Sequence, residues 1–142
     1  MPVQVRDATP ADAAAVAELL GELGYPTTAT EVASRLRRFG ADPASRVLLA
    51  EVDGDIAGLV ATHLVPRLEE DRPSSRIVAI VTAAAHRRAG IGTALTEAAA
   101  AEARELDACR LDLSSGDWRA DAHSFYERLG FVDRARSYTR WL

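Results

Sequence analysis

The chain has 142 residues, of which 48% are hydrophobic and 27% charged, and its formal net charge is −4. The length suits one domain over residues 1–142, the composition is that of a soluble globular protein, and the negative charge disfavours a nucleic-acid partner. No apolar run approaches the ~20 residues of a membrane span. No secretory signal is visible at the N-terminus, so we expect a cytoplasmic protein. A single cysteine excludes an internal disulfide and a cysteine-based zinc site.

The first half of the chain predicts a strand, two helices and a hairpin, in that order. These elements are a strand at Val3–Arg6, a helix opened by Thr9 and Pro10 and stopped by Gly24, a helix capped by Thr30 that runs to about Phe39, and strands at 46–52 and 56–65. Asp53-Gly54-Asp55 separates the last two strands and is a typical hairpin signal.

The second half predicts a crossover from one strand to another through a long helix. Its elements are a polar loop at 66–75, a buried strand at 76–82, a long helix at 91–106, a strand at 109–114, a helix at 119–129 ended by Gly130, and one or two final strands in 131–142. Hairpin strands first and a strand–helix–strand crossover later predict an α/β fold, with a mixed sheet and helices on both faces.

The segment between the buried strand and the long helix has the features of an anion site. The first turn of a helix has N–H groups without partners and carries partial positive charge. Gly90 and Gly92 remove the side chains that would keep a ligand away from those amides, while Arg87 and Arg88 add positive charge. The pattern favours a phosphate or pyrophosphate as the ligand, and a plain tight turn before a helix is the alternative.

Two well-known phosphate motifs do not fit this segment. A P-loop ends in Gly-Lys-Ser/Thr, and all 17 basic residues of this chain are arginine. A dinucleotide-binding fingerprint needs a third glycine three residues after Gly92, where the chain has Leu95.

The segment does resemble the Arg/Gln-x-x-Gly-x-Gly/Ala signature of the GNAT acyltransferases. A second segment, Ala122–Phe131, carries Phe-Tyr and ends in Gly-Phe, and it is similar to another hallmark of that family. The resemblance covers essentially the whole chain. It implies a mixed, mostly antiparallel sheet of six to seven strands, flanked by about four helices, with splayed central strands.

The resemblance also implies N-acetyltransferase activity with acetyl-CoA as co-substrate, an amine as acceptor and no metal. The residues that it assigns to acetyl-CoA are Arg87, Arg88, Ala89, Gly90, Ile91, Gly92 and Thr93 around the pyrophosphate, and the backbone of Ile80, Val81 and Thr82 along the pantetheine arm. A backbone N–H near Thr82 would stabilise the carbonyl oxygen in the transition state. Arg119 stands where many members have asparagine, and it is assigned to the cofactor, to the substrate or to solvent.

The matching tyrosine, Tyr126, is expected to be the general acid that protonates the leaving thiolate. The alternative is a core role, because Tyr126 shares a helical face with Ala122 and Phe125. Many members place a glutamate in the central strand as the base, whereas this strand contains no acid and has Ala79 near that position. The base is therefore left open.

The acceptor cannot be read from a motif, and three residues are candidates to face it: Tyr25, His63 and Glu70. The expected acceptor is the primary amine of a small molecule or peptide, and the negative charge slightly favours a cationic one. Homodimers are common in the family, but no feature of the sequence proves one. A non-catalytic acyl-CoA sensor with the same fold stays open as the alternative function, as does a tRNA-directed acetyltransferase.

Overall fold

The computed structural model describes residues 2–114, 120–135 and 137–142, which form two compact units, Met1–Asp112 and Leu113–Leu142. The first unit is built on one sheet. Its strands are β1 (Gln4–Asp7), β2 (Ser45–Val52), β3 (Asp55–Val65), β4 (Ser74–Thr82) and β5 (Leu111–Asp112). They lie side by side in chain order. The first four pair antiparallel, and β5 runs parallel to β4.

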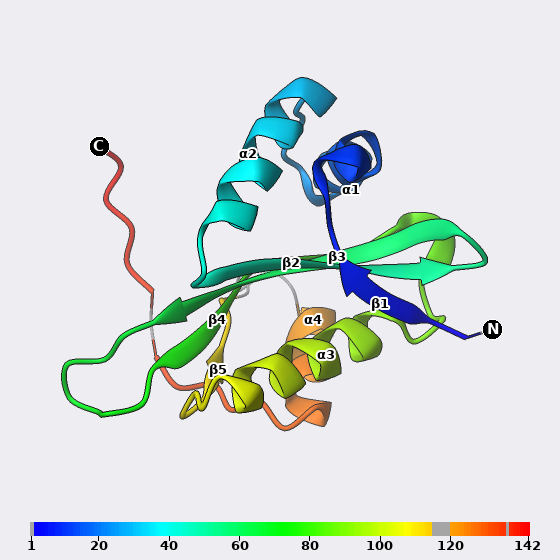
Figure 1. Ribbon diagram of the computed structural model, residues 1–142. Coiled ribbons are helices and arrows are strands. Elements are labelled where there is room, and N and C mark those ends of the chain that lie inside the picture. The colour runs from blue at the N-terminus through cyan, green and yellow to red at the C-terminus, as the bar shows by residue number, and fades with distance from the viewer. Residues whose placement is uncertain (1, 115–119, 136) are drawn as a thin grey trace. The chain divides into compact units, whose positions relative to one another are not determined.

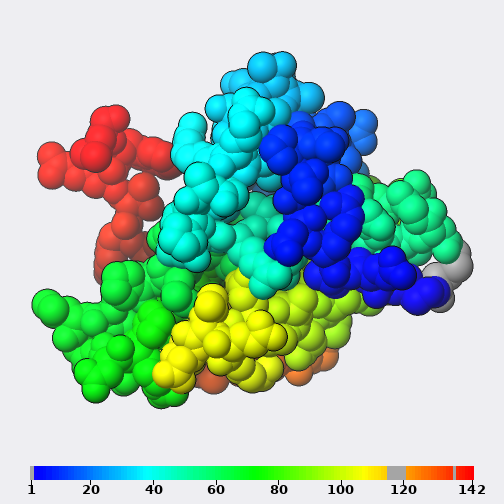
Figure 2. Space-filling view, viewed as in Figure 1, coloured from blue at the N-terminus to red at the C-terminus, as the bar shows by residue number. Residues whose placement is uncertain are grey.

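Helices cover both faces of the sheet in the first unit. α1 (Ala13–Leu23) and α2 (Ala29–Ala41) lie on one face, and α3 (Ile91–Glu105) lies on the other (Figure 1). Figure 2 shows α1 and α2, in blue and cyan, packed together on the strands. In the second unit, the described residues form one helix, α4 (Ala120–Arg128). The predicted α/β class, with a mixed and mostly antiparallel sheet, is confirmed; the extent of the domain stays a prediction.

Two apolar layers hold the helices on the sheet. The first joins α1 and α2 to the strands and consists of Ala13, Val16, Leu19, Val32, Leu36, Leu49, Leu59 and Val81. On the other face, α3 buries Ile91, Leu95, Ala99 and Ala103. Burying a leucine or isoleucine side chain fully contributes about 1.5–3 kcal/mol to the stability of the fold, so the two layers fix the positions of the helices on the sheet.

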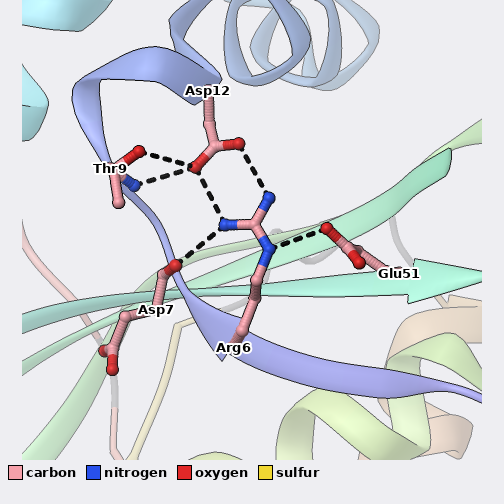
Figure 3. A network of polar contacts seen from close by, with 5 residues as sticks. All are labelled: Arg6, Asp7, Thr9, Asp12 and Glu51. Atoms are coloured by element: carbon pink, nitrogen blue, oxygen red, sulfur yellow. Dashed lines mark hydrogen bonds and ion pairs between the residues drawn. The ribbon is translucent and has the colours of Figure 1, made fainter. Parts of the chain in front are cut away.

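Polar contacts fix the entry to α1. A short 3-10 turn, η1 (Pro10–Asp12), precedes the helix, and Thr9 is its N-cap, as predicted. The Asp12 carboxylate accepts the Thr9 N–H at 2.8 Å and two guanidinium bonds from Arg6 at 2.8 and 3.0 Å. Arg6 Nε also donates to Glu51 at 2.7 Å, so one arginine ties β1, η1 and β2 together (Figure 3). Gly24, in the left-handed conformation, ends α1.

The predicted cap of the second helix was wrong by two residues. Thr28, not Thr30, is the N-cap: its Oγ1 accepts the Glu31 N–H at 3.1 Å, while the Glu31 carboxylate accepts the Thr28 N–H at 3.0 Å. This reciprocal arrangement needs a glutamate or glutamine three residues after the cap. Thr30 has Ala33 at that distance.

The predicted six to seven strands were also too many. The strand expected at 109–114 is shortened to Leu111–Asp112, and residues 131–135 and 137–142 form no strand. An extended segment becomes a strand only where a neighbouring chain pairs with its backbone. Side chains in this segment are instead exposed, as Val132, Tyr138 and Trp141 show.

Candidate functional site

In the segment from β4 to α3, two residues have a positive φ before the helix starts. After Thr82 the chain forms a 3-10 turn, η2 (Ala84–His86), and Gly90 then caps α3. Arg88 has φ of 67° and Gly90 has φ of 78°. Glycine adopts such angles at little cost, whereas any other residue loses roughly 1–2 kcal/mol. Strain of this kind at Arg88 is typical of segments shaped around a ligand.

This geometry leaves a row of backbone donors at the positive end of α3. Within the described part of the chain, the backbone hydrogen bonds of this segment stop at the Arg87 N–H, which reaches Ala84 O at 3.5 Å. They resume at the Ala94 N–H, which reaches Gly90 O at 3.0 Å. The loop is exposed, and a side chain at Gly90 would meet no atom within 4 Å. Amides, helix dipole and open space together suit a pyrophosphate.

The strand that leads into this loop has an open edge. β4 pairs with β5 only at Ser75–Leu111 and Arg76–Asp112, whereas it pairs with β3 from Ser74 to Thr82, apart from Val78. From 77 to 82, therefore, the outer edge of β4 has no strand partner within residues 2–112. The early separation of β4 and β5 agrees with the predicted splay. Ile80, Val81 and Thr82, which were assigned to the pantetheine arm, lie along this edge.

A β-bulge interrupts β4 on the same stretch. Ala79 pairs with Ala61 and Ile77 with Thr62, which leaves Val78 as the extra residue. The Val78 side chain is 50% exposed. Bulges redirect backbone groups and are frequent next to active sites.

Gly58 positions the helix that carries the loop, and the sequence analysis missed it. A Cβ at Gly58 would lie 2.7 Å from the carbonyl oxygen of Val81 and 2.9 Å from Cγ2 of Ile91. The first turn of α3 therefore packs directly on the backbone of β3. A lone glycine inside a strand pattern is a known sign of such close approach, so the sequence did contain the signal.

Glu22 is a second residue that the sequence analysis missed. Its Oε1 accepts the Ala84 N–H at 3.2 Å, which links the last turn of α1 to the start of η2. No local pattern marks this glutamate, because the contact depends on how α1 packs on the sheet.

The three residues proposed to face the acceptor lie on different segments. Tyr25 is 68% exposed in the connection after α1. Glu70 lies between β3 and β4, with its carboxylate 3.8 Å from Nε of Arg72. His63 is half-exposed near the end of β3, and its Nδ1 lies 2.8 Å from the Ser45 hydroxyl. No hydrogen bond or ion pair joins any two of them in the described residues.

The tyrosine motif forms a compact arrangement within the second unit. The Tyr126 ring contacts Phe125 and Phe131 edge to face, with centroids 5.2 and 5.7 Å apart. The Phe131 N–H donates to the Tyr126 carbonyl at 3.0 Å, and Gly130 is left-handed. Phe-Tyr and Gly-Phe are thus two parts of one helix end. Arg119 lies outside the described residues.

Among the described residues, no cluster of three histidine, cysteine or acidic side chains is arranged to hold a metal ion. Nor is any helix in the described residues both long and apolar enough to cross a membrane.

Comparison with known proteins agrees with this geometry. The sequence model of the Acetyltransferase (GNAT) family matches residues 14–131, which include the loop before α3 and the tyrosine motif. An aminoalkylphosphonate N-acetyltransferase from Salmonella typhimurium is 32% identical, over 100% of this chain and 94% of the relative. A putative acetyltransferase from Agrobacterium tumefaciens has a TM-score of 0.90 at 25% identity, covering 98% of this chain and 99% of the other.

A crystal structure of a transcriptional regulator from Bacillus halodurans is also similar, with a TM-score of 0.91 at 23% identity, covering 99% of this chain and 100% of that one. At that identity the likeness shows the fold alone. The open strand edge, the amide-lined loop and the family match together define an acyltransferase. The chain belongs to the GNAT acetyltransferase family, whose members generally use acetyl-CoA.

Proposed function

We propose that this enzyme transfers the acetyl group of acetyl-CoA to the primary amine of a small molecule. The observation that carries the proposal is the strained loop at Arg87–Thr93, at the end of an open strand edge. Within the described residues, the backbone N–H groups between Arg87 and Ala94 make no backbone hydrogen bond. The amides of Arg88, Ala89, Gly90, Gly92 and Thr93 would hold the pyrophosphate, and the edge of β4 would hold the pantetheine arm.

The acceptor class is suggested by the relative that is 32% identical over the whole chain. That relative is named for aminoalkylphosphonates, which carry an amine and an anionic group on one small skeleton. We therefore put small amines with an anionic group first, ahead of polyamines and protein N-termini. The match to this relative over the whole chain carries more weight for the choice of acceptor than the overall charge of −4.

The chemistry is direct attack in a ternary complex. The lone pair of the amine nitrogen forms a bond to the thioester carbonyl carbon, and the C–S bond breaks. A backbone N–H of β4 would stabilise the oxygen that becomes negative. The departing thiolate takes a proton from the Tyr126 hydroxyl, and the proton that the nitrogen loses as the amide forms returns to the tyrosine through solvent.

Binding is tested first, by thermal unfolding with acetyl-CoA, free CoA or NAD. A ligand that binds only the folded state raises the midpoint. We expect acetyl-CoA and CoA to raise it and NAD to leave it unchanged. No shift at millimolar acetyl-CoA would mean that the loop at 87–93 is only a turn before a helix.

Turnover is tested next, by thiol release with a panel of amines that includes 2-aminoethylphosphonate, a polyamine and a peptide N-terminus. Tyr126→Phe removes only the hydroxyl group, which is the proposed proton donor to the leaving thiolate. We therefore expect it to lower kcat by ~10²–10⁴-fold. The acetyl-CoA midpoint shift of this variant should equal that of the wild type. Unchanged turnover would remove Tyr126 from the mechanism, and binding without turnover for any amine would favour a sensor.

A further inference from the structure

Three polar side chains form a hydrogen-bonded chain at one end of the sheet. The hydroxyl of Ser45 donates to Oδ2 of Asp42 at 2.8 Å, and Nδ1 of His63 lies 2.8 Å from the same hydroxyl oxygen. Asp42 is the C-cap residue of α2, and its Oδ1 also accepts the Ala44 N–H at 2.9 Å. Ser45 and His63 are directly paired residues of β2 and β3.

The direction of these bonds fixes the histidine tautomer. A serine hydroxyl has one proton, and a carboxylate can only accept. Hydrogen bonds from Ala44 and Ser45 hold the pKa of Asp42 below its usual value, so this carboxyl is ionised at neutral pH. The Ser45 hydroxyl therefore donates its one hydrogen bond to Asp42 and must accept a hydrogen bond from Nδ1–H of His63. In the neutral ring the lone pair is then on Nε2.

The register places this histidine on β3, the strand next to β4, close to the bulge. Leu59 lies in the core under α1 and α2, and alternation along β3 puts Ala61 and His63 on that same face. Ala61 pairs with Ala79 at the bulge, and His63 pairs with Arg76. On β3, His63 is therefore two residues, roughly 7 Å, from the residue that pairs with the bulge of β4.

Helix α2 leaves this corner uncovered. The end of the β3–β4 hairpin extends past the C-terminal end of α2 (Figure 1). The side chains of His63 and Asp42 are each 43% exposed. A small molecule that approaches β4 from the α1–α2 face therefore meets an imidazole with an acceptor nitrogen.

We propose that His63 is the general base of the acetyl transfer, with Ser45 and Asp42 as its positioning residues. This step rests on the proposed function. Nε2 of His63 takes a proton from the ammonium group of the acceptor, which frees the nitrogen lone pair for attack on the thioester carbonyl. The imidazolium keeps its Nδ1–H on Ser45 and is stabilised by the negative charge of Asp42. It later gives the proton to solvent.

The charges around His63 oppose each other. They are negative on Asp42, whose Oδ2 lies 3.8 Å from Nδ1 of His63, and positive on Arg76, its register partner on β4. The β2 residue that faces it, Ser45, is neutral. Imidazole groups change charge between about pH 5 and 8, so a base of this kind gives kcat/KM an acidic limb.

The kinetic test compares the wild type with His63→Gln, Ser45→Ala and Ser34→Ala. Ser34 lies on the exposed face of α2 and is the matched control for the serine substitution. His63→Gln should lower kcat/KM by ~10²-fold or more and abolish its acidic limb. Ser45→Ala should lower kcat by a smaller factor, and Ser34→Ala should leave it unchanged. Added imidazole should restore part of the turnover of His63→Ala.

The outcomes separate this proposal from the proposed function. All variants should keep the acetyl-CoA midpoint shift, because none of the three side chains is part of the loop at 87–93. If His63→Gln keeps kcat/KM within twofold and the same pH profile, His63 is not the base, although the enzyme still acetylates. An independent readout is the ¹⁵N NMR spectrum of the ring without substrates. It should show the Nδ1–H tautomer in the wild type and lose that preference in Ser45→Ala; an Nε2–H tautomer would overturn the proposal even without turnover.

Discussion

The hydroxyl of Thr62 donates to Oε1 of Glu102 over 2.7 Å, and this buried bond joins β3 to the C-terminal half of α3. The other carboxylate oxygen of Glu102 accepts from Nη1 of Arg46 at 3.0 Å. Thr62 is 2% exposed and Glu102 is 6% exposed. A buried carboxylate is costly unless its lone pairs are satisfied, so this helix depends on both donors.

Thr62→Val tests that dependence. The substitution removes the donor and leaves Oε1 of Glu102 buried without it, which should lower the free energy of unfolding by about 1–3 kcal/mol. Urea denaturation measures the change. In a Glu102→Leu background the same substitution should cost close to nothing, because no acceptor remains to be satisfied. An equal cost in both backgrounds would show that the bond does not contribute.

Gly58→Ala should push the first turn of α3 away from the sheet. The new Cβ meets the Val81 carbonyl and Ile91 at less than 3.0 Å, so we expect a loss of about 1–3 kcal/mol of unfolding free energy. The acetyl-CoA midpoint shift should shrink with it, since the amides of this turn move. Gly40→Ala is the control: it lies in α2, has no atom within 4 Å of the new Cβ, and should stabilise by about 0.5–1 kcal/mol. Equal effects on the acetyl-CoA shift would argue against the anchoring role of Gly58.

Substitution by glycine should change the stability of the protein in opposite directions at the two loop arginines. Arg88 is left-handed, so Arg88→Gly removes roughly 1–2 kcal/mol of strain, partly offset by the flexibility of glycine in the unfolded chain. Arg87 has an ordinary φ of −62°, so Arg87→Gly relieves no strain and only destabilises, through the flexibility of glycine in the unfolded chain. Because each variant removes one cation, both should weaken acetyl-CoA binding. Thermal unfolding without ligand measures the difference; the same sign for both variants would mean that Arg88 is not strained.

Asp12 should make the fold less stable in acid. The hydrogen bonds from Arg6 lower the pKa of Asp12 from 3.8 to about 2. The ion pair therefore contributes fully above pH 4, and its contribution is lost as the pH falls through 3.8 toward 2. Because Arg6 is partly exposed, we expect roughly 1 kcal/mol rather than the full value of the shift.

The measurement is the difference in unfolding free energy between wild type and Asp12→Asn, at pH 6 and at pH 2.5. That difference should shrink at the lower pH, because protonation has already removed the charge in the wild type. Asp71→Asn, in the exposed loop between β3 and β4, should show no such trend. A difference that is the same at both pH values would place the stabilisation elsewhere.

Features set by neighbours in sequence were predicted well. The hairpin turn at 53–55, the cap at Thr9 and the helix stop at Gly24 each depend on a few adjacent residues, and all three were confirmed. The error at Thr30 was avoidable, because the Thr-x-x-Glu pattern that starts at Thr28 is also local.

Features set by strand pairing could not be read in the same way. The final strands were inferred from residue type, but a strand exists only with a partner, and residue type does not specify one. The contact between Asp42, Ser45 and His63 depends on the register of β2 with β3. The position of His63 on the chain suggested a substrate role, yet nothing near it in sequence indicated which residues would hold its ring.

The strand order has a consequence for how the molecule folds. β2, β3 and β4 follow one another through short connections, so residues 45–82 can pair with little loss of chain entropy. β1 and β5 reach this meander only across two helices on one side and one helix on the other. We therefore expect the central meander to form in the folding transition state and the edge strands to join later. The loop at 87–93 lies in the later part, so it becomes able to hold a ligand only near the end of folding.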